Sequence, residues 1–348
     1  MSTVITPTDV PDLVATTLRD LGRLKFQQIA QNLVHYEVFS KWFKKDRMSF
    51  DSGIGIQRTL MSKLGSGAAK HTGYLDSDDV TMPDVLTQMT VPWVHAQTSW
   101  GLVYQQDILM NSGKELILNV IKPRRADSMI QLVEMLEDKA WSAPASSTDK
   151  LSPYGLPYWV VANDTQGFNG GLPSGHSTVA GVNLTDNPNF KNYSFKYTTV
   201  SQDDLIKKLR TAHRNCRFVS PIKSDDYSGK SGDRYRIYTD EATISNLEDI
   251  SAAQNQNLGR DMASQDGLVT FRKHPVIWVP QLDSTTNAPV YMIDHSTFYP
   301  VCLRGDYLRE SEAKEVAGQH NAFSVFVDLT YNYICVDRRR NCVGTTGA

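Results

Sequence analysis

Apolar side chains recur at helical spacing over a long stretch in the first half of the chain. Ser112 and Glu115 form a capping box there, and beyond Pro123 the apolar positions follow an i, i+3, i+4, i+7 pattern as far as Trp141. A helix over 112–141 would be about 45 Å long at the rise of an ordinary α-helix. A helix of that length is more typical of an extended subunit, which it would span, than of a compact domain.

The second half of the chain carries shorter helical and extended patterns. One helix is predicted after Ser201, with Asp204 completing its capping box, and another is predicted from Thr239. Strands are predicted over 155–161, 234–239, 271–280, 289–294 and 321–336, where β-branched and aromatic residues gather. Because helices and strands are segregated rather than strictly alternating, the pattern favours an α+β fold over a doubly wound α/β fold.

Residues 51–111 are poor in long apolar runs and rich in glycine, and they predict a long two-stranded excursion with a flexible tip. An isolated hairpin is only marginally stable in water, so such an excursion is expected to pack on another subunit. Trp93, Trp100 and Tyr104 are the aromatic residues from which we expect that packing.

The first 50 residues begin with apolar residues at roughly helical spacing and end in the run FSKWFKKDR (39–47), which is both aromatic and basic. One interpretation is an amphipathic helix that packs on the chain's own core. The other is an arm that lies on a neighbouring copy, and in that case Trp42 and Phe43 are the expected contacts.

Composition is that of a globular protein of 348 residues, with 40% hydrophobic and 21% charged side chains. The formal net charge of −2 gives no global attraction to DNA or to an anionic membrane, and it leaves little repulsion between many copies. The start of the chain lacks a secretory signal, and no apolar run approaches the roughly 18 residues that cross a bilayer. Folding in a cytosol is therefore expected, without contact with a membrane.

Sites for metals and cofactors are not predicted. The eight histidines show no metal-ligand spacing, and the phosphate-binding glycine motifs are absent. The four cysteines form no CxxC pair and are expected to be free, buried thiols, namely Cys216, Cys302, Cys335 and Cys342. Three basic clusters, at 41–45, 122–125 and 338–340, are interpreted as solvated charge, with acidic interface neighbours or packaged DNA as the alternative.

One short motif carries possible catalytic chemistry. The run PSGH (173–176) is similar to one block of the acid-phosphatase and lipid-phosphatase superfamily, in which Ser, Gly and His help to hold a phosphate. The blocks that would supply the other phosphate ligands and a nucleophilic histidine are not recognisable in this sequence. We therefore interpret the run as a surface loop and predict no catalytic residue. A phosphoester hydrolase that uses Ser174 and His176 is the weaker alternative.

A family resemblance covers about residues 110–345. In order and spacing, seven segments resemble the major capsid proteins of tailed bacteriophages, which have the Hong Kong 97-type coat fold. They are GLPYWVV (155–161), GFNGG (167–171), NFKNY (189–193) and the ranges 203–221, 236–283, 288–311 and 325–341. The first hundred residues match by architecture alone.

The resemblance implies a division of this α+β chain into five parts. They are an N-terminal arm (1–50), an extended β-hairpin loop (51–111), a peripheral domain with a spine helix (112–199), an axial domain (200–290) and a return to the peripheral domain (291–348). The tips of the axial domain would meet at fivefold and sixfold centres.

The implied function is that of a structural protein and not an enzyme. Copies would assemble through pentamers and hexamers into the icosahedral shell of a virion in the cytoplasm of a bacterial host. Expected partners are further copies, a portal, scaffolding or decoration proteins, and double-stranded DNA contacted non-specifically. An encapsulin-like nanocompartment shell is the alternative. Some family members crosslink Lys to Asn, but nothing in this sequence pairs Lys63 or Lys70 with Asn341, so no crosslink is predicted.

Overall fold

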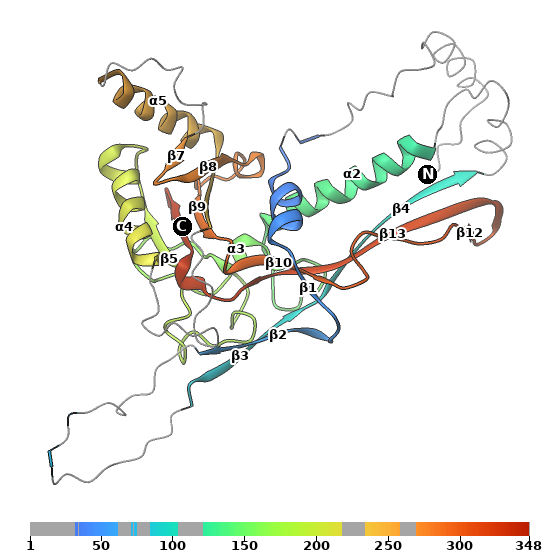
Figure 1. Ribbon diagram of the computed structural model, residues 1–348, viewed down its shortest axis with the longest axis horizontal. Helices are drawn as coiled ribbons and strands as arrows, with labels where there is room; N and C mark the ends of the chain where they lie inside the picture. Colours follow the sequence, from blue (N-terminus) through green and yellow to red (C-terminus); the bar gives the residue numbers. More distant parts are fainter. Residues whose placement is uncertain are drawn as a thin grey trace. The chain divides into compact units, whose positions relative to one another are not determined.

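The computed structural model describes residues 32–33, 35–61, 71, 73–74, 84–103, 121–217, 234–257 and 269–347. The chain divides into two compact units. The first comprises Met1–Val34, Ala96–Met135 and Gly305–Leu329, and the second comprises His35–His95, Leu136–Arg304 and Thr330–Ala348. Helices and mixed sheets occur together in the described residues (Figure 1), which confirms the expected α+β class.

The first unit combines strands with part of one long helix. Its elements are β11 (Arg309–Glu310), β12 (Lys314–Val316) and the larger parts of β4 (Val94–Val103), β13 (Gln319–Cys335) and α2 (Ile121–Ala140). Both β11 and β12 pair with β13 in antiparallel register. The Arg125 guanidinium donates two hydrogen bonds to Glu310 Oε1, at 2.9 and 2.6 Å, which ties α2 to β11. The long predicted helix is thus confirmed over α2, while 112–120 lie outside the described residues.

A six-stranded mixed sheet forms the centre of the second unit. Its order is β5 (Tyr193–Lys196), β14 (Cys342–Thr345), β9 (Val290–Asp294), β6 (Tyr235–Thr239), β8 (His274–Trp278) and β7 (Thr270–Phe271). The β5–β14 and β6–β8 pairs are parallel, and the other neighbours are antiparallel. Because side chains alternate between the faces of a strand, residues such as Ile237 and Met292 point to one face and Tyr238 and Ile293 to the other.

Helices cover one face of this sheet. The first helical segment begins at Ser201. Its Oγ accepts a hydrogen bond from the Asp204 backbone N–H at 3.2 Å, which confirms the predicted capping box. It continues as the π-helical η3 (Gln202–Ile206) and then as α4 (Lys207–Cys216). The third predicted helix is α5 (Glu241–Asn257). Apolar residues of both helices join the core of this face, among them Leu205, Leu209, Ala212 and Leu247.

The antiparallel hairpin expected before residue 111 is present but shorter. It consists of β2 (Gly55–Met61) and β3 (Leu86–Pro92), paired from Gly55 with Pro92 to Met61 with Leu86. β4 follows β3 directly but pairs with β13, so residues 94–103 belong to a larger sheet and not to the excursion, while 104–111 lie outside the described residues. The alternating pattern of β4 is that of a strand in a larger sheet, and sequence periodicity does not identify its partner.

Two further predictions need correction. Residues Leu156–Trp159 form the short helix α3 rather than a buried strand, because Pro157 occupies its first turn, where a fixed φ favours a helix. The boundary expected near residue 290 does not coincide with a structural boundary. The expected division assigns β9 and β14 to the return to the peripheral domain. In the structure, however, β9 pairs with β6 and β14 pairs with β5, and all four strands belong to one sheet.

The second unit is completed by short elements. β1 (Met48–Phe50) pairs in parallel with β10 (Phe298–Leu303), and β10 pairs antiparallel with the last residues of β13. One π-helical segment, η1 (Val38–Asp46), precedes β1, and the 3-10 turns η5 (Pro280–Leu282) and η6 (Arg338–Arg340) lie later in the chain.

Candidate functional site

The aromatic residues of η1 lie inside the second unit. Trp42 is completely buried, and its ring centroid lies 5.2–5.9 Å from those of five rings, namely Trp141, Tyr238, His295, Phe298 and Tyr333. Phe43 is also buried and contacts Tyr331 and Tyr333 edge-on. Their side chains are not at the surface, so the expectation that Trp42 and Phe43 contact a neighbouring copy is wrong. The simpler interpretation, an amphipathic segment on its own core, holds for this stretch.

A chain of polar contacts crosses this aromatic core. The Trp42 indole N–H donates to Tyr238 Oη at 2.8 Å, and Tyr238 Oη lies 2.7 Å from His295 Nε2. With its oxygen accepting from Trp42, the tyrosine hydroxyl donates to a neutral His295. Burial together with the nearby Arg236 charge lowers the pKa of His295 well below its ordinary value, which favours this neutral form.

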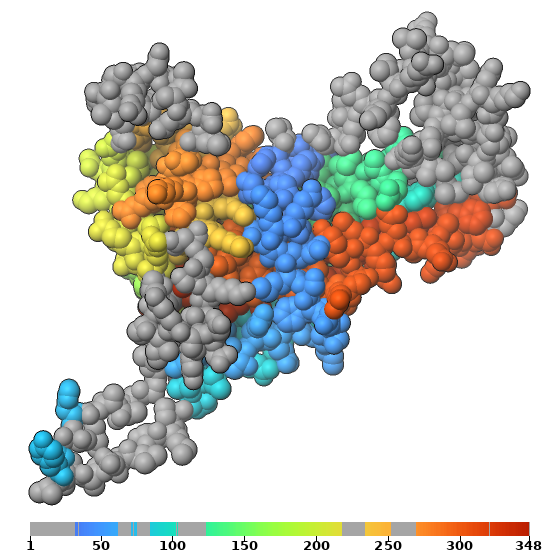
Figure 2. Space-filling view, in the orientation of Figure 1, coloured from blue at the N-terminus to red at the C-terminus, as the bar shows by residue number. Residues whose placement is uncertain are grey.

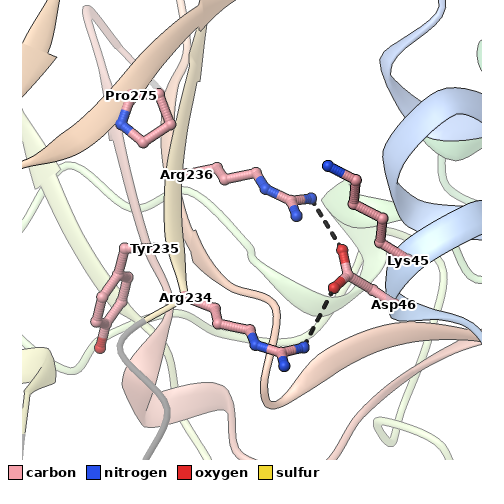
Figure 3. A pocket seen from close by; sticks show the side chains of 6 residues that line it. All are labelled: Lys45, Asp46, Arg234, Tyr235, Arg236 and Pro275. Atoms are coloured by element: carbon pink, nitrogen blue, oxygen red, sulfur yellow. Dashed lines mark hydrogen bonds and ion pairs between the residues drawn. The ribbon is translucent and has the colours of Figure 1, made fainter.

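The polar chain leads to an ion cluster at the end of η1. Asp46 Oδ2 lies 2.9 Å from the Arg236 guanidinium, and Asp46 Oδ1 lies 3.5 Å from that of Arg234 (Figure 3). Lys45, Tyr235 and Pro275 complete the lining of a cavity of about 380 Å³ around them. The cluster fixes η1 to β6, because the almost fully buried Asp46 side chain is paired with the arginine side chains of 234 and 236.

Glu137 of α2 holds the beginning of η1. Its carboxylate oxygens accept from the backbone N–H groups of Glu37, Val38 and Phe39 at 3.0–3.3 Å. These N–H groups are the ones that a helix leaves without internal partners. Burial of the carboxyl nevertheless outweighs these hydrogen bonds and raises the pKa of Glu137 to about 7.

This raised pKa predicts a pH-dependent stability. Between pH 4.5 and 7 the folded chain retains a proton that the unfolded chain has released, so this contribution is complete below pH 4.5 and is lost as the pH rises to 7. We expect the free energy of unfolding of the unassembled chain to fall by about 3 kcal/mol over this window. Glu137→Gln should remove that slope in urea unfolding, whereas Asp138→Asn, on the exposed neighbour, should keep it. An unchanged slope in Glu137→Gln contradicts the assignment.

The hairpin presents two different faces. Ile56, Leu60, Met89 and Val91 are buried along one face. The opposite face is polar near its base, where Gln88 Nε2 donates to Gln57 Oε1 at 3.0 Å.

The far end of the exposed face is apolar. Met61 and Leu86 are directly opposite each other in the register, and they are 56% and 59% exposed. Asn332 fixes the base of the hairpin through a hydrogen bond from Nδ2 to Pro92 O at 2.7 Å. The described part of the hairpin therefore extends from an anchored base to an exposed apolar pair. This pair was not predicted from the sequence.

The other three aromatic residues expected to contact a neighbouring copy lie in different surroundings. Trp93 connects β3 to β4, and its indole N–H donates to Gly53 O at 2.9 Å. Trp100 lies on β4 and is partly exposed, and Tyr104 lies outside the described residues. Contacts of these three residues with another copy remain a prediction.

The PSGH run forms a tight turn. Gly175 adopts a φ of +73°, and a Cβ there would lie 2.4 Å from Ala145 O, so the turn requires glycine. Ser174 is exposed, and His176 Nε2 lies 3.4 Å from Pro144 O, with the ring edge-on to Tyr158. In the part of the chain that the structure describes, no carboxylate contacts His176, so a base oriented for nucleophilic catalysis is not formed there.

The third basic cluster is not solvated as expected. Arg338 is completely buried and donates to Trp159 O, Phe190 O, Gly171 O and Asn192 Oδ1 at 2.6–3.1 Å. Desolvation lowers the pKa of Arg338 to about 10, so it keeps its charge at neutral pH. Its four acceptors belong to the end of α3 and to two loops, which the guanidinium joins.

The cysteines are confirmed as free and buried. Burial raises the pKa of the Cys302 thiol to about 12, which leaves it protonated and unreactive at neutral pH. Asn341 is also buried, and its amide N–H groups donate to Thr297, Cys335 and Asp337. Among the described residues, no group of His, Cys, Asp and Glu side chains could hold a metal ion, and no helix could span a membrane.

Among the comparisons with known proteins, only the one with solved structures gives a match. No protein-family model and no curated protein matches the sequence. Solved structures, however, match nearly the whole chain. The capsid asymmetric unit of cyanophage A-1(L) is 12% identical, with a TM-score of 0.64, over 95% of this chain and 99% of that chain.

Two further structures agree with it. The capsid of the native GTA particle is 10% identical, with a TM-score of 0.56, over 96% of this chain and 99% of that chain. Gordonia phage Cozz is 11% identical, with a TM-score of 0.54, over 95% of this chain and 91% of that chain. At such identities the likeness establishes the fold. The chain therefore has the Hong Kong 97-type coat fold that its sequence predicted.

Proposed function

We propose that the chain is the major capsid protein of a tailed bacteriophage. Copies would associate through pentamers and hexamers into the icosahedral shell that encloses the genome. The observation that supports this proposal is the fold, which is shared with capsid structures over more than nine tenths of both chains. The protein would act by geometry and not by catalysis, in the virion capsid, after assembly in the cytoplasm of the host.

The parts of the fold have proposed roles. We assign α2 to the spine of a peripheral domain, the six-stranded sheet with α4 and α5 to an axial domain, and the β2–β3 hairpin to a loop that reaches a neighbouring copy. A portal, scaffolding or decoration proteins and packaged double-stranded DNA are the expected further partners.

Expression of the chain alone provides the first test. Negative-stain imaging and size-exclusion chromatography should reveal rings, closed shells or tubes. A persistent monomer would overturn the proposal, and phosphoester hydrolysis by that monomer would favour the alternative at Ser174 and His176. Shells isolated from the native source that contain a protein cargo instead of DNA would favour a nanocompartment.

The exposed apolar pair on the hairpin gives a sharper prediction. Changing both Met61→Ser and Leu86→Ser should reduce the yield of shells at least about tenfold, because burial of such side chains contributes on the order of 1.5–3 kcal/mol each. The melting temperature of the unassembled chain should change little, since both side chains are exposed. The matched control is Gln57→Ser with Gln88→Ser, on the same face nearer the base, which should assemble normally. Equal yields from both pairs would contradict the role of the hairpin.

A further inference from the structure

The helix α4 carries positive charge on its exposed side. Leu209, Ala212 and Cys216 are buried against the sheet, while Lys207, Arg210 and Arg214 are exposed at i, i+3 and i+7. α4 contains no acidic residue, and none of its three exposed cations forms an ion pair within the described residues. Like charges at this spacing weaken an isolated helix. Arg214, in the last turn, gains from the helix dipole, but the repulsion along the row opposes that gain.

The helix α5 carries the opposite charge. Thr243 and Leu247 are buried, while Glu241, Glu248 and Asp249 are exposed. The sequence of α5 contains neither lysine nor arginine, and its three acidic side chains have no cationic partner in the described part of the chain. The second unit thus presents one basic helix and one acidic helix, each with its charge unneutralised.

The two helices cover the same face of the sheet, and Arg210 of α4 and Leu247 of α5 line a common cavity between them. α4 packs against β5 and β14 at one end, and α5 packs against β8, next to the opposite edge strand β7 (Figure 1). The surface of α4, in yellow, is exposed in Figure 2. A head-to-tail contact between two copies can bring the basic helix of one copy onto the acidic helix of the next. Repetition of one such contact closes a ring when the rotation between successive copies divides a full turn.

We propose that the exposed cations of α4 pair with the exposed carboxylates of α5 from an adjacent copy around each ring. This inference rests on the proposed shell function and identifies the partner of these two surfaces as a second copy of the chain. Single exposed ion pairs are weak, but the contact recurs at every junction of the ring and gains from multivalency. Like charges repel when α4 meets α4 or α5 meets α5, so the charges also select head-to-tail over twofold pairing.

Charge reversal tests the contact. One variant carries Lys207→Glu, Arg210→Glu and Arg214→Glu, and a second carries Glu241→Lys, Glu248→Lys and Asp249→Lys. Each should lower the yield of rings and shells at least about tenfold, because every junction then opposes like charges. The combined variant with all six changes keeps the native net charge of −2 and should assemble again. Circular dichroism should show that all three variants are folded, because the changed side chains are exposed.

Mixing the two triple variants provides a second readout. A junction between them is complementary in both directions, so their copies should alternate around a ring. Alternation closes with six copies but not with five. The mixture should therefore form sixfold rings, sheets or tubes and no fivefold vertices.

The outcomes separate this inference from the proposed function. Failure of the unchanged chain to form rings or shells overturns the function. Normal shells from the unchanged chain and from both triple variants overturn the helix contact alone. Failure of the folded six-change variant and of the mixture, with both triple variants also inactive, overturns the pairing of α4 with α5 specifically.

Discussion

Arg338→Ala should destabilise the second unit by about 3–5 kcal/mol. The guanidinium supplies every hydrogen bond that joins Trp159 O, Phe190 O, Gly171 O and Asn192 Oδ1 to the η6 turn. Removing it leaves the carbonyl groups of Trp159, Phe190 and Gly171 without this donor, while Asn192 Oδ1 still accepts from Val161 N–H, and each unpaired buried acceptor costs about 1–3 kcal/mol. A domain has only about 5–15 kcal/mol of stability, so much of this variant should be insoluble on expression.

The comparison with lysine tests the geometry of this site. Arg338→Lys keeps the charge but supplies three donors from one nitrogen instead of a planar fork, so most of the loss should remain. The control is Arg304→Ala, which removes an exposed arginine paired with an exposed Asp51 and should leave the stability almost unchanged. Urea unfolding of the unassembled chains measures all three. Arg338→Lys with native stability would show that charge alone, and not the fork, holds the loops together.

The position of Arg338 also shows a limit of prediction from sequence. Residues 338–340 are three identical side chains, and no periodicity distinguishes the buried one from its neighbours. The distinction arises from carbonyl groups at 159, 171 and 190, at the end of α3 and in two loops far away in the sequence. A backbone carbonyl is present at every residue, so its convergence on one point has no sequence signature.

Sequence signals that depend on neighbouring residues predicted the structure more reliably. The capping box at Ser201 and the apolar periodicity of α2 and α5 correctly predicted helices, because both depend on residues within one or two turns. The hairpin was also predicted, but the residue at which its second strand ends was not. β3 and β4 are separated by Trp93 alone, and the strand pattern continues through both while the pairing partner changes from β2 to β13.

The expected intersubunit contacts of Trp42 and Phe43 failed for a related reason. In the run around Trp42 and Phe43, aromatic residues alternate with lysines, and such a pattern suits either the chain's own core or a neighbouring copy. The deciding feature is the set of five rings around Trp42, which come from four other parts of the chain. By contrast, the exposed apolar pair Met61 and Leu86 lies 25 positions apart, and the strand register alone brings these residues together.

Trp42→Ala should cost about 3–5 kcal/mol, comparable to the loss of Arg338. The indole is completely buried, so its removal leaves a large cavity among aromatic rings that are themselves held by the surrounding strands. It also leaves the Tyr238 hydroxyl without its donor. Far-UV circular dichroism in urea measures this loss, because tryptophan fluorescence would change with the residue itself.

Two conservative variants separate the packing of Trp42 from its hydrogen bond. Trp42→Phe keeps most of the ring volume and should cost about 1–2 kcal/mol, while Tyr238→Phe leaves the indole N–H unpaired and should cost a similar amount. If the two act through one hydrogen bond, the double variant should cost less than the sum of the single variants by about 1 kcal/mol. Strict additivity would show that the 2.8 Å contact between them contributes nothing, and that the burial of the ring alone fixes η1 to the core.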